Sequence, residues 1–230
     1  MDEARSAPFG IQRYIATRVA NDCHDVAEIV ALPRVADAPA FDRSEWIHEQ
    51  LKRVVQDMTV PWVVALQAEC RASDACTVMH IGADVYLCPT HDEELQCSAL
   101  AYTYHALDAA AEQLQSPHHF PAHTRIPKQS QHLFGAVSKQ LARVFLHIWH
   151  HHPALFRQCE AQSSLYARFY ALVDMYELFP VDELPEAGTM GSSDAGTGAP
   201  AHTQGSMSST QGAHDGEKPA ATPQSAPAQP

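Results

Sequence analysis

Apolar residues recur along most of the chain at the three- and four-residue spacing of an amphipathic helix. The pattern is clearest in residues 131–150, where Leu133, Val137, Leu141 and Ile148 fall on one face. Similar spacing predicts one or two short helices in residues 11–32, and further helices at 41–58, 62–70, 98–115, 154–162 and 165–178. We therefore expect a mostly α protein, built as a helical bundle.

Polar residues and prolines mark where these helices begin and where they are interrupted. Asp42 stands three residues before Glu45, as in a capping box, and Ser98 is a favourable N-cap. The proline-containing residues 33–40 and 116–130 are expected to be loops. Residues 77–88 differ from the rest: two β-prone runs flank Gly-Ala-Asp, which predicts one small β-hairpin.

The last part of the chain has a different composition. Residues 188–230 hold seven of the ten glycines and no Phe, Trp or Tyr, so they offer little apolar surface to offset chain entropy. We predict a flexible N-terminus at residues 1–10, one helical domain at 11–187 and a disordered tail at 188–230.

Charge and hydropathy narrow the class of protein. A net charge of −12 argues against nucleic-acid binding, which depends on neutralising phosphates, but permits an acidic face for a basic protein partner. No apolar run approaches the ~20 residues of a membrane span, and the acidic N-terminus does not look like a signal peptide. We expect a cytoplasmic protein that meets membranes, if at all, through its partners.

Four histidines gather in residues 147–152, just before Pro153. On an unbroken helix His147 would pair with His151, one turn away. Proline disfavours helical angles at the preceding residue, so His152 could instead lie beside His147. Spacing alone leaves both pairs open.

Cys70 and Cys76 are the best partners for two of these histidines. Two thiolates and two imidazoles make a closed tetrahedral zinc site. Five residues separate the cysteines, more than the usual two to four, so small buried thiols beside solvated histidines fit the pattern equally well. Cys88 and Cys97, with His91, could form a second site, but free buried cysteines are the expectation there.

Several segments together resemble the Mob/phocein family, and in places its phocein branch. They are "LQAECRASDACTVM", "YLCPTHDEELQCSALAYTYHALD", "VFLHIWHHH" and "LYARFYALVDMYELFPVDEL", in this order along the predicted domain. The resemblance implies a helical bundle with one structural Zn²⁺ ion held by Cys70, Cys76, His147 and His152. The chain departs from the family in having five rather than four residues between the two cysteines.

The resemblance also implies a function. A phocein-like protein would be a non-enzymatic adaptor for germinal-centre kinases and for the striatin assembly, which contains a type 2A phosphatase. The alternative is a Mob-type co-activator of nuclear Dbf2-related kinases, which belong to the AGC class. A zinc hydrolase is a remote alternative, because the "HIWHH" segment lacks the glutamate that a zincin uses as general base, and no Gly-rich phosphate loop occurs.

Two surface regions match partner-binding regions of the family. In the first, an acidic helix start with an exposed tryptophan would meet a basic kinase segment, and Asp42, Glu45, Trp46 and Glu49 stand there. An ordinary capped, solvated helix with a half-buried tryptophan is an equal alternative.

In the second region, Lys139 and Arg143 match a phosphothreonine-binding patch of the family, one helical turn apart. Gln140 takes the place of a third, normally basic residue. Two cations on a helix are often only solvated, which is the alternative here.

Overall fold

The computed structural model describes residues 8–35, 38–71, 75–88, 90–91, 97–121 and 125–186. The chain divides into two units, residues 1–192 and 193–230, and all described residues belong to the first. The prediction of a disordered tail at 188–230 lies outside the described residues, as do residues 1–7 of the predicted flexible N-terminus.

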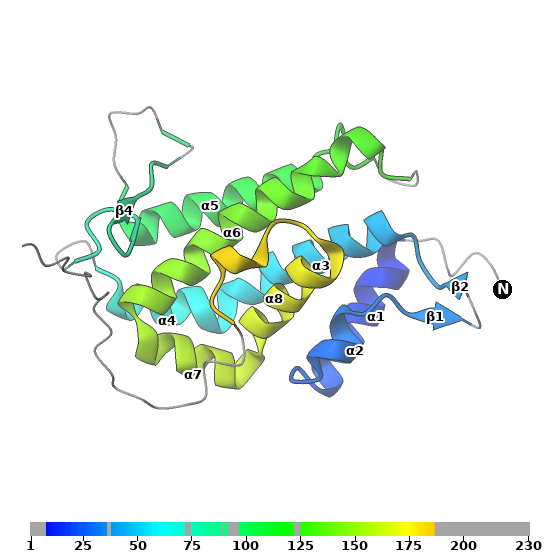
Figure 1. The fold of residues 1–230 in the computed structure, drawn as a ribbon, viewed down its shortest axis with the longest axis horizontal. Helices are drawn as coiled ribbons and strands as arrows, with labels where there is room; N and C mark the ends of the chain where they lie inside the picture. The colour runs from blue at the N-terminus through cyan, green and yellow to red at the C-terminus, as the bar shows by residue number, and fades with distance from the viewer. Residues whose placement is uncertain are drawn as a thin grey trace, which may run out of the picture. The chain divides into compact units, whose positions relative to one another are not determined.

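The described part of the chain is mostly helical, so the predicted helical class is confirmed (Figure 1). Its α-helices are α1 (Pro8–Asn21), α2 (Val26–Val30), α3 (Arg43–Asp57), α4 (Val64–Glu69), α5 (Ala99–Gln115), α6 (His132–His151), α7 (Pro153–Ser163) and α8 (Leu165–Tyr176). The segment η1 (Met58–Val63) joins α3 to α4 through a kink, with Val60 in a non-helical conformation (φ −132°, ψ 125°). 3-10 turns form η2 (Lys128–Ser130) and η3 (Val181–Glu183).

Two short antiparallel strand pairs accompany the helices. β3 (His80–Ile81) and β4 (Asp84–Val85) form the predicted hairpin, which turns at Gly82 with a positive φ of 58°. A second pair, β1 (Arg34–Val35) and β2 (Ala38–Pro39), lies where we expected only a loop. Each of these strands has two residues, too short for an alternating pattern to appear in the sequence.

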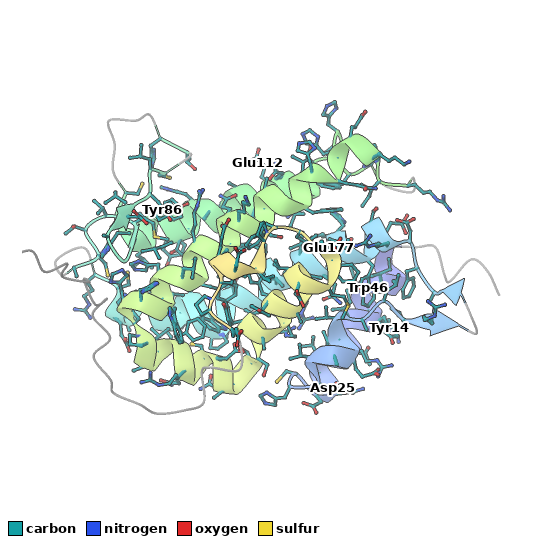
Figure 2. All side chains as sticks on the ribbon, viewed as in Figure 1. Tyr14, Asp25, Trp46, Tyr86, Glu112 and Glu177 are labelled. Atoms are coloured by element: carbon teal, nitrogen blue, oxygen red, sulfur yellow. The ribbon has the colours of Figure 1, made fainter. Side chains whose placement is uncertain are left out.

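Helix α3 occupies the middle of the bundle and packs against α1, α5, α6 and α8. Trp46 of α3 is fully buried, and Tyr14 and Phe41 pack around it (Figure 2). Trp62 of η1, the segment after α3, is also fully buried and meets the rings of Phe145 and Phe156 edge-on. This aromatic core fixes the positions of α4, α6 and α7, which carry the site described next.

The predicted helix starts are present. The Asp42 carboxylate accepts hydrogen bonds from the backbone N–H groups of Ser44 and Glu45, at 2.9 and 3.3 Å. The Ser98 hydroxyl accepts one from Ala101 at 3.2 Å. Both side chains satisfy backbone donors that have no partner inside the helix, so they define where α3 and α5 begin.

Candidate metal centre

The junction between α6 and α7 decides which histidines lie together. α6 ends at His151, and Pro153 is the first residue of α7. His152 between them has φ −134° and ψ 55°, outside the helical region, as expected for a residue before proline. Its Nε2 therefore lies 3.3 Å from Cys76 Sγ, and its ring is 5.5 Å from that of His147, centroid to centroid. The ring of His151 is nearer to that of His147, at 4.8 Å, but it packs on His80 at 3.9 Å and is not among the residues whose ligand atoms converge.

Cys70, Cys76, His147 and His152 form one cluster, which we call cluster 1. Their ligand atoms all lie within 4.8 Å of one another. Cys70 Sγ is 3.6 Å from His147 Nε2, and Cys76 Sγ is 3.3 Å from His152 Nε2. Cys70 is the C-cap of α4, so the cluster joins the end of α4 to the end of α6.

These distances fit a metal ion at the centre of cluster 1. A tetrahedral ion with Zn–S and Zn–N bonds of ordinary length would hold sulfur and nitrogen about 3.6 Å apart. The two sulfur–nitrogen distances are within 0.3 Å of that value. The five-residue spacing of the cysteines thus still brings both sulfurs to the same point.

Neighbouring groups orient the two imidazoles. His147 Nδ1 donates to the carbonyl of His80 at 2.8 Å, so the lone pair of Nε2 faces the sulfur atoms. His152 Nδ1 faces a Glu69 carboxylate oxygen at 3.9 Å. Carbonyl and carboxylate groups behind a ligand histidine are the usual second layer of a metal site.

Burial also sets the protonation states. It lowers the pKa of His147 to about 4, so this imidazole is neutral and able to bind a metal at physiological pH. Burial, together with the neighbouring Cys76 thiol, raises the pKa of Cys70 to about 12. A pair of thiolates at this place therefore needs a compensating cation, which a divalent metal supplies.

A second group, cluster 2, consists of Cys88, His91, Cys97 and His105, whose ligand atoms also lie within 4.8 Å of one another. The sequence predicted a single site and treated Cys88 and Cys97 as free buried cysteines. Cys97 is only half-buried, and both sulfurs lie close to His105. His105, which lies within α5, was missed in the sequence analysis. It could have been found by noting that two helical turns after Cys97 bring His105 back to the same side of the helix as Cys97.

Comparisons with known proteins identify the family of the chain. A profile of the Mob1/phocein family matches residues 18–186. The chain belongs to the Mob1/phocein family. "MOB kinase activator-like 4" of Drosophila melanogaster is 30% identical over 182 residues, which are 79% of this chain and 79% of the relative. "MOB-like protein phocein" of Caenorhabditis elegans is 30% identical over 185 residues, with the same coverage. The resemblance found from the motifs is confirmed, and both clusters lie inside the matched region.

The first predicted partner region of this Mob1/phocein protein differs from the expectation. Trp46 is fully buried and donates its indole N–H to the carbonyl of Val30 at 2.9 Å, so it is not exposed. Glu49 is also buried and contacts Lys52 at 3.1 Å. Asp42 and Glu45 are half-buried and remain the acidic groups at the helix start. The sequence left an exposed and a half-buried tryptophan as equal alternatives, and the residue is fully buried instead. Helical spacing alone did not show whether this indole faces the core or the solvent.

The second predicted region lies on α6. Lys139 is exposed and Gln140 is half-buried. Arg143 lies 5.1 Å from the centre of the Tyr86 ring, and its Nη1 donates to the Tyr102 hydroxyl at 3.4 Å. The guanidinium thus has a fixed position above two tyrosines, and Lys139 is the more accessible cation.

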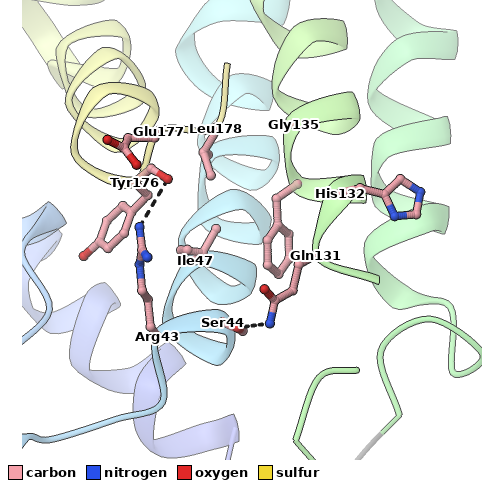
Figure 3. Close-up of a pocket in the computed structure, with 10 residues that line it drawn as sticks. Arg43, Ser44, Ile47, Gln131, His132, Gly135, Tyr176, Glu177 and Leu178 are labelled. Atoms are coloured by element: carbon pink, nitrogen blue, oxygen red, sulfur yellow. Dashed lines mark hydrogen bonds between the residues drawn. The ribbon is translucent and has the colours of Figure 1, made fainter. Parts of the chain in front are cut away.

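A hollow of about 270 Å³ lies away from both clusters, between α3, α6 and the end of α8 (Figure 3). Arg43 Nη2 donates to the Tyr176 carbonyl at 3.3 Å, and Gln131 Nε2 donates to the Ser44 hydroxyl at 2.9 Å. These polar side chains of the wall are thus engaged with neighbours, and none of the predicted site residues lines the hollow. Within the part of the chain described, no helix combines the length and apolarity needed to cross a bilayer.

Proposed function

We propose that this chain is a non-enzymatic, zinc-stabilised adaptor that binds protein kinases or striatin-type assemblies of phosphatase and kinase. The observation that carries this is the match to a relative named phocein over 79% of both chains. The relative named a MOB kinase activator supports the alternative, a co-activator of nuclear Dbf2-related or other AGC kinases, to the same extent. We expect the protein to act in the cytoplasm and to reach membranes only through its partners.

The proposed metal of cluster 1 is Zn²⁺ in a structural role. Two thiolates and two imidazoles fill the four positions of a tetrahedral ion, which leaves none for the water of a hydrolase. Glu69 lies behind the ring of His152 rather than beside an open position, so it suits an orienting role better than that of a general base. The donor set therefore favours a scaffold over an enzyme.

Two surfaces are proposed for the partners. Asp42 and Glu45 lie at the start of α3, where a basic segment of a kinase would find two carboxylates. Lys139 and Arg143 of α6 would attract a phosphothreonine. Gln140 beside them supplies no charge, and its amide nitrogen is buried. Since Arg143 already contacts two tyrosines, we expect it to bind a phosphate only on its free edge.

Affinity purification of the full chain, with identification of the co-purifying proteins, tests the proposal. Striatin together with type 2A phosphatase subunits would support the phocein-like adaptor. An AGC kinase without them would support the co-activator, and the absence of any kinase or phosphatase subunit would contradict both.

A charge reversal tests the acidic surface in the same experiment. Glu45→Lys should reduce the recovery of a kinase that binds through a basic segment. Glu112→Lys makes the same charge change at an exposed position of α5 and is the control. Equal recovery of the kinase with both variants would mean that the kinase binds a surface other than the start of α3.

A further inference from the structure

Cluster 2 gathers its four side chains from one short stretch of the chain. Cys88 follows strand β4, His91 lies in the turn after it, Cys97 precedes the N-cap of α5, and His105 is on α5 itself. Cys88 Sγ is 3.3 Å and Cys97 Sγ is 3.5 Å from the same atom, His105 Nδ1. The ring of His91 lies 4.7 Å from that of His105, nearly perpendicular to it.

Ordinary hydrogen bonds do not account for this convergence. A neutral imidazole nitrogen has either one lone pair or one proton, so Nδ1 of His105 makes one good hydrogen bond. Two sulfur atoms approach it, and a second imidazole adjoins them. A tetrahedral zinc ion would hold each sulfur about 3.6 Å from each nitrogen, which matches both observed distances.

We propose that Cys88, His91, Cys97 and His105 bind a second Zn²⁺ ion. Its donor set is again two thiolates and two imidazoles, and the two residues between Cys88 and His91 give the usual short spacing of a zinc site. Four protein ligands close the coordination sphere, so this ion is structural as well. Binding would form two Zn–S and two Zn–N bonds, displace water from the aqueous ion and release the two thiol protons to solvent.

The surrounding segment explains why a second ion is useful. The β3–β4 hairpin is only two residues long on each strand, and Val85 and Leu87 are 54% and 50% exposed. So small a hairpin has little apolar surface to bury and is marginal by itself. His147 of cluster 1 holds its first strand through the carbonyl of His80, and Cys88 of cluster 2 holds the chain that leaves its second strand.

The two clusters also meet at the start of α5. The backbone N–H of Ala99 donates to the carbonyl of Cys76 at 3.1 Å, so the helix that supplies His105 touches a ligand of cluster 1. The ion in cluster 2 fixes the register of this helix start through Cys97. Loss of that ion should therefore loosen, but not abolish, metal binding at cluster 1.

The two ions should differ in accessibility. Three of the ligands in cluster 1 are buried, whereas in cluster 2 His91 is exposed and Cys97 and His105 are half-buried. A chromophoric chelator that reports released Zn²⁺ should remove one equivalent quickly and a second one slowly. The fast equivalent should be absent from Cys97→Ser.

Metal analysis of the purified full chain is the direct test. We expect two equivalents of zinc per chain in the parent and one in each of Cys97→Ser and His91→Ala. His91→Ala should disturb the packing of the fold less than Cys97→Ser, because His91 is exposed. Cys23→Ser, a half-buried cysteine outside both clusters, should keep two. With Co²⁺ in place of Zn²⁺, the sulfur-to-metal absorption should fall by about half in the two cluster 2 variants, as expected for one of two equal S₂N₂ sites.

Three results would overturn the proposal. One is a single equivalent in the parent that Cys97→Ser does not change while His152→Ala removes it. Another is two equivalents in both the parent and Cys97→Ser. The third is an intact mass that reveals a Cys88–Cys97 disulfide in chain purified under reducing conditions.

Discussion

At the scale of single residues, the backbone of His152 has the largest effect on the site. Helical geometry would have paired His147 with His151, but Pro153 ends α6 and turns His152 toward the two cysteines. His151 keeps its helical contact with the ring of His147 and also packs against His80, but it is not part of cluster 1. The two neighbouring histidines therefore lie in different surroundings, which their spacing alone could not separate and only the family resemblance distinguished.

Replacement of these two histidines should have unequal effects. Structural zinc contributes ~10 kcal/mol or more in small domains, so His152→Ala should lower the melting temperature by on the order of 10 °C or more. His151 lies outside cluster 1 and its ring contacts those of His80, His147 and His150, so His151→Ala should lower the melting temperature by about 2–4 °C, the equivalent of ~1 kcal/mol. Calorimetry of both variants with saturating zinc gives the comparison, and equal losses would contradict the assignment of His152 to cluster 1.

Gly135 is required for a close contact between α6 and the chain after α8. A Cβ atom at this position would lie 2.6 Å from the carbonyl oxygen of Leu178, a backbone atom that cannot move freely (Figure 3). Gly135→Ala should destabilise the protein by roughly 1–3 kcal/mol, because this overlap outweighs the helix propensity gained. Ala136→Ser, at the exposed next position, should stay within about 0.5 kcal/mol of the parent. Urea unfolding would measure both, and a more stable Gly135→Ala would show that α6 moves away at little cost.

At the scale of elements, the sequence predicted long features better than short ones. Apolar spacing and the caps Asp42 and Ser98 sufficed for α3, α5 and α6, since each signal is local and repeats over several turns. β1 and β2 were missed because two residues carry no period. His105 was missed for another reason: its ligand partners lie in the preceding loop, and only the helix register brings them together.

One half-buried carboxylate joins α7 to α8. Glu160 of α7 accepts hydrogen bonds from the backbone N–H groups of Tyr166 and Ala167, at 2.8 and 2.9 Å, in the first turn of α8. Burial nevertheless raises the pKa of Glu160, the two backbone donors opposing this only in part. The folded protein thus binds a proton at this carboxyl more tightly than the unfolded chain does.

The sign of the pH dependence follows from that direction. A raised carboxyl pKa means that the folded state gains relative stability as the pH falls through the folded pKa toward the unfolded value. Glu160→Gln lacks this titration and should lose about 1 kcal/mol at pH 7 by weakening one of the two hydrogen bonds. The free energy of unfolding of the parent, minus that of the variant, should therefore be larger at pH 5 than at pH 7. Urea unfolding at both values measures it, and a smaller difference at pH 5 would mean that the backbone donors dominate.

At the scale of the whole molecule, the aromatic core and the two clusters lie in different parts of the bundle. Trp46 of α3 and Trp62 of η1 are fully buried, and their indole N–H groups donate to the Val30 carbonyl and the Ser163 hydroxyl. The hairpin buries less, with Val85 and Leu87 about half exposed, and the cysteines and histidines converge on either side of it. Composition and motifs predicted this bundle and cluster 1, whereas the number of clusters required the three-dimensional arrangement.

The end of the packed domain can be located from its contacts. Leu184 is 6% exposed, and the Tyr166 hydroxyl donates to the carbonyl of Pro185 at 2.6 Å. The composition of residues 188–230, with many glycines and few apolar residues, predicts a tail that adds nothing to this packing.

Truncation after Ala187 should therefore leave the melting temperature unchanged. Truncation after Pro180 removes Leu184 and the hydrogen-bond acceptor of Tyr166, which together contribute about 2–4 kcal/mol, so it should lower the melting temperature by several degrees. Calorimetry of the parent and of the two truncated chains separates the effect of residues 181–187 on the melting temperature from that of residues 188–230. An equal loss in both would mean that residues 188–230 dock on the domain and belong to its fold.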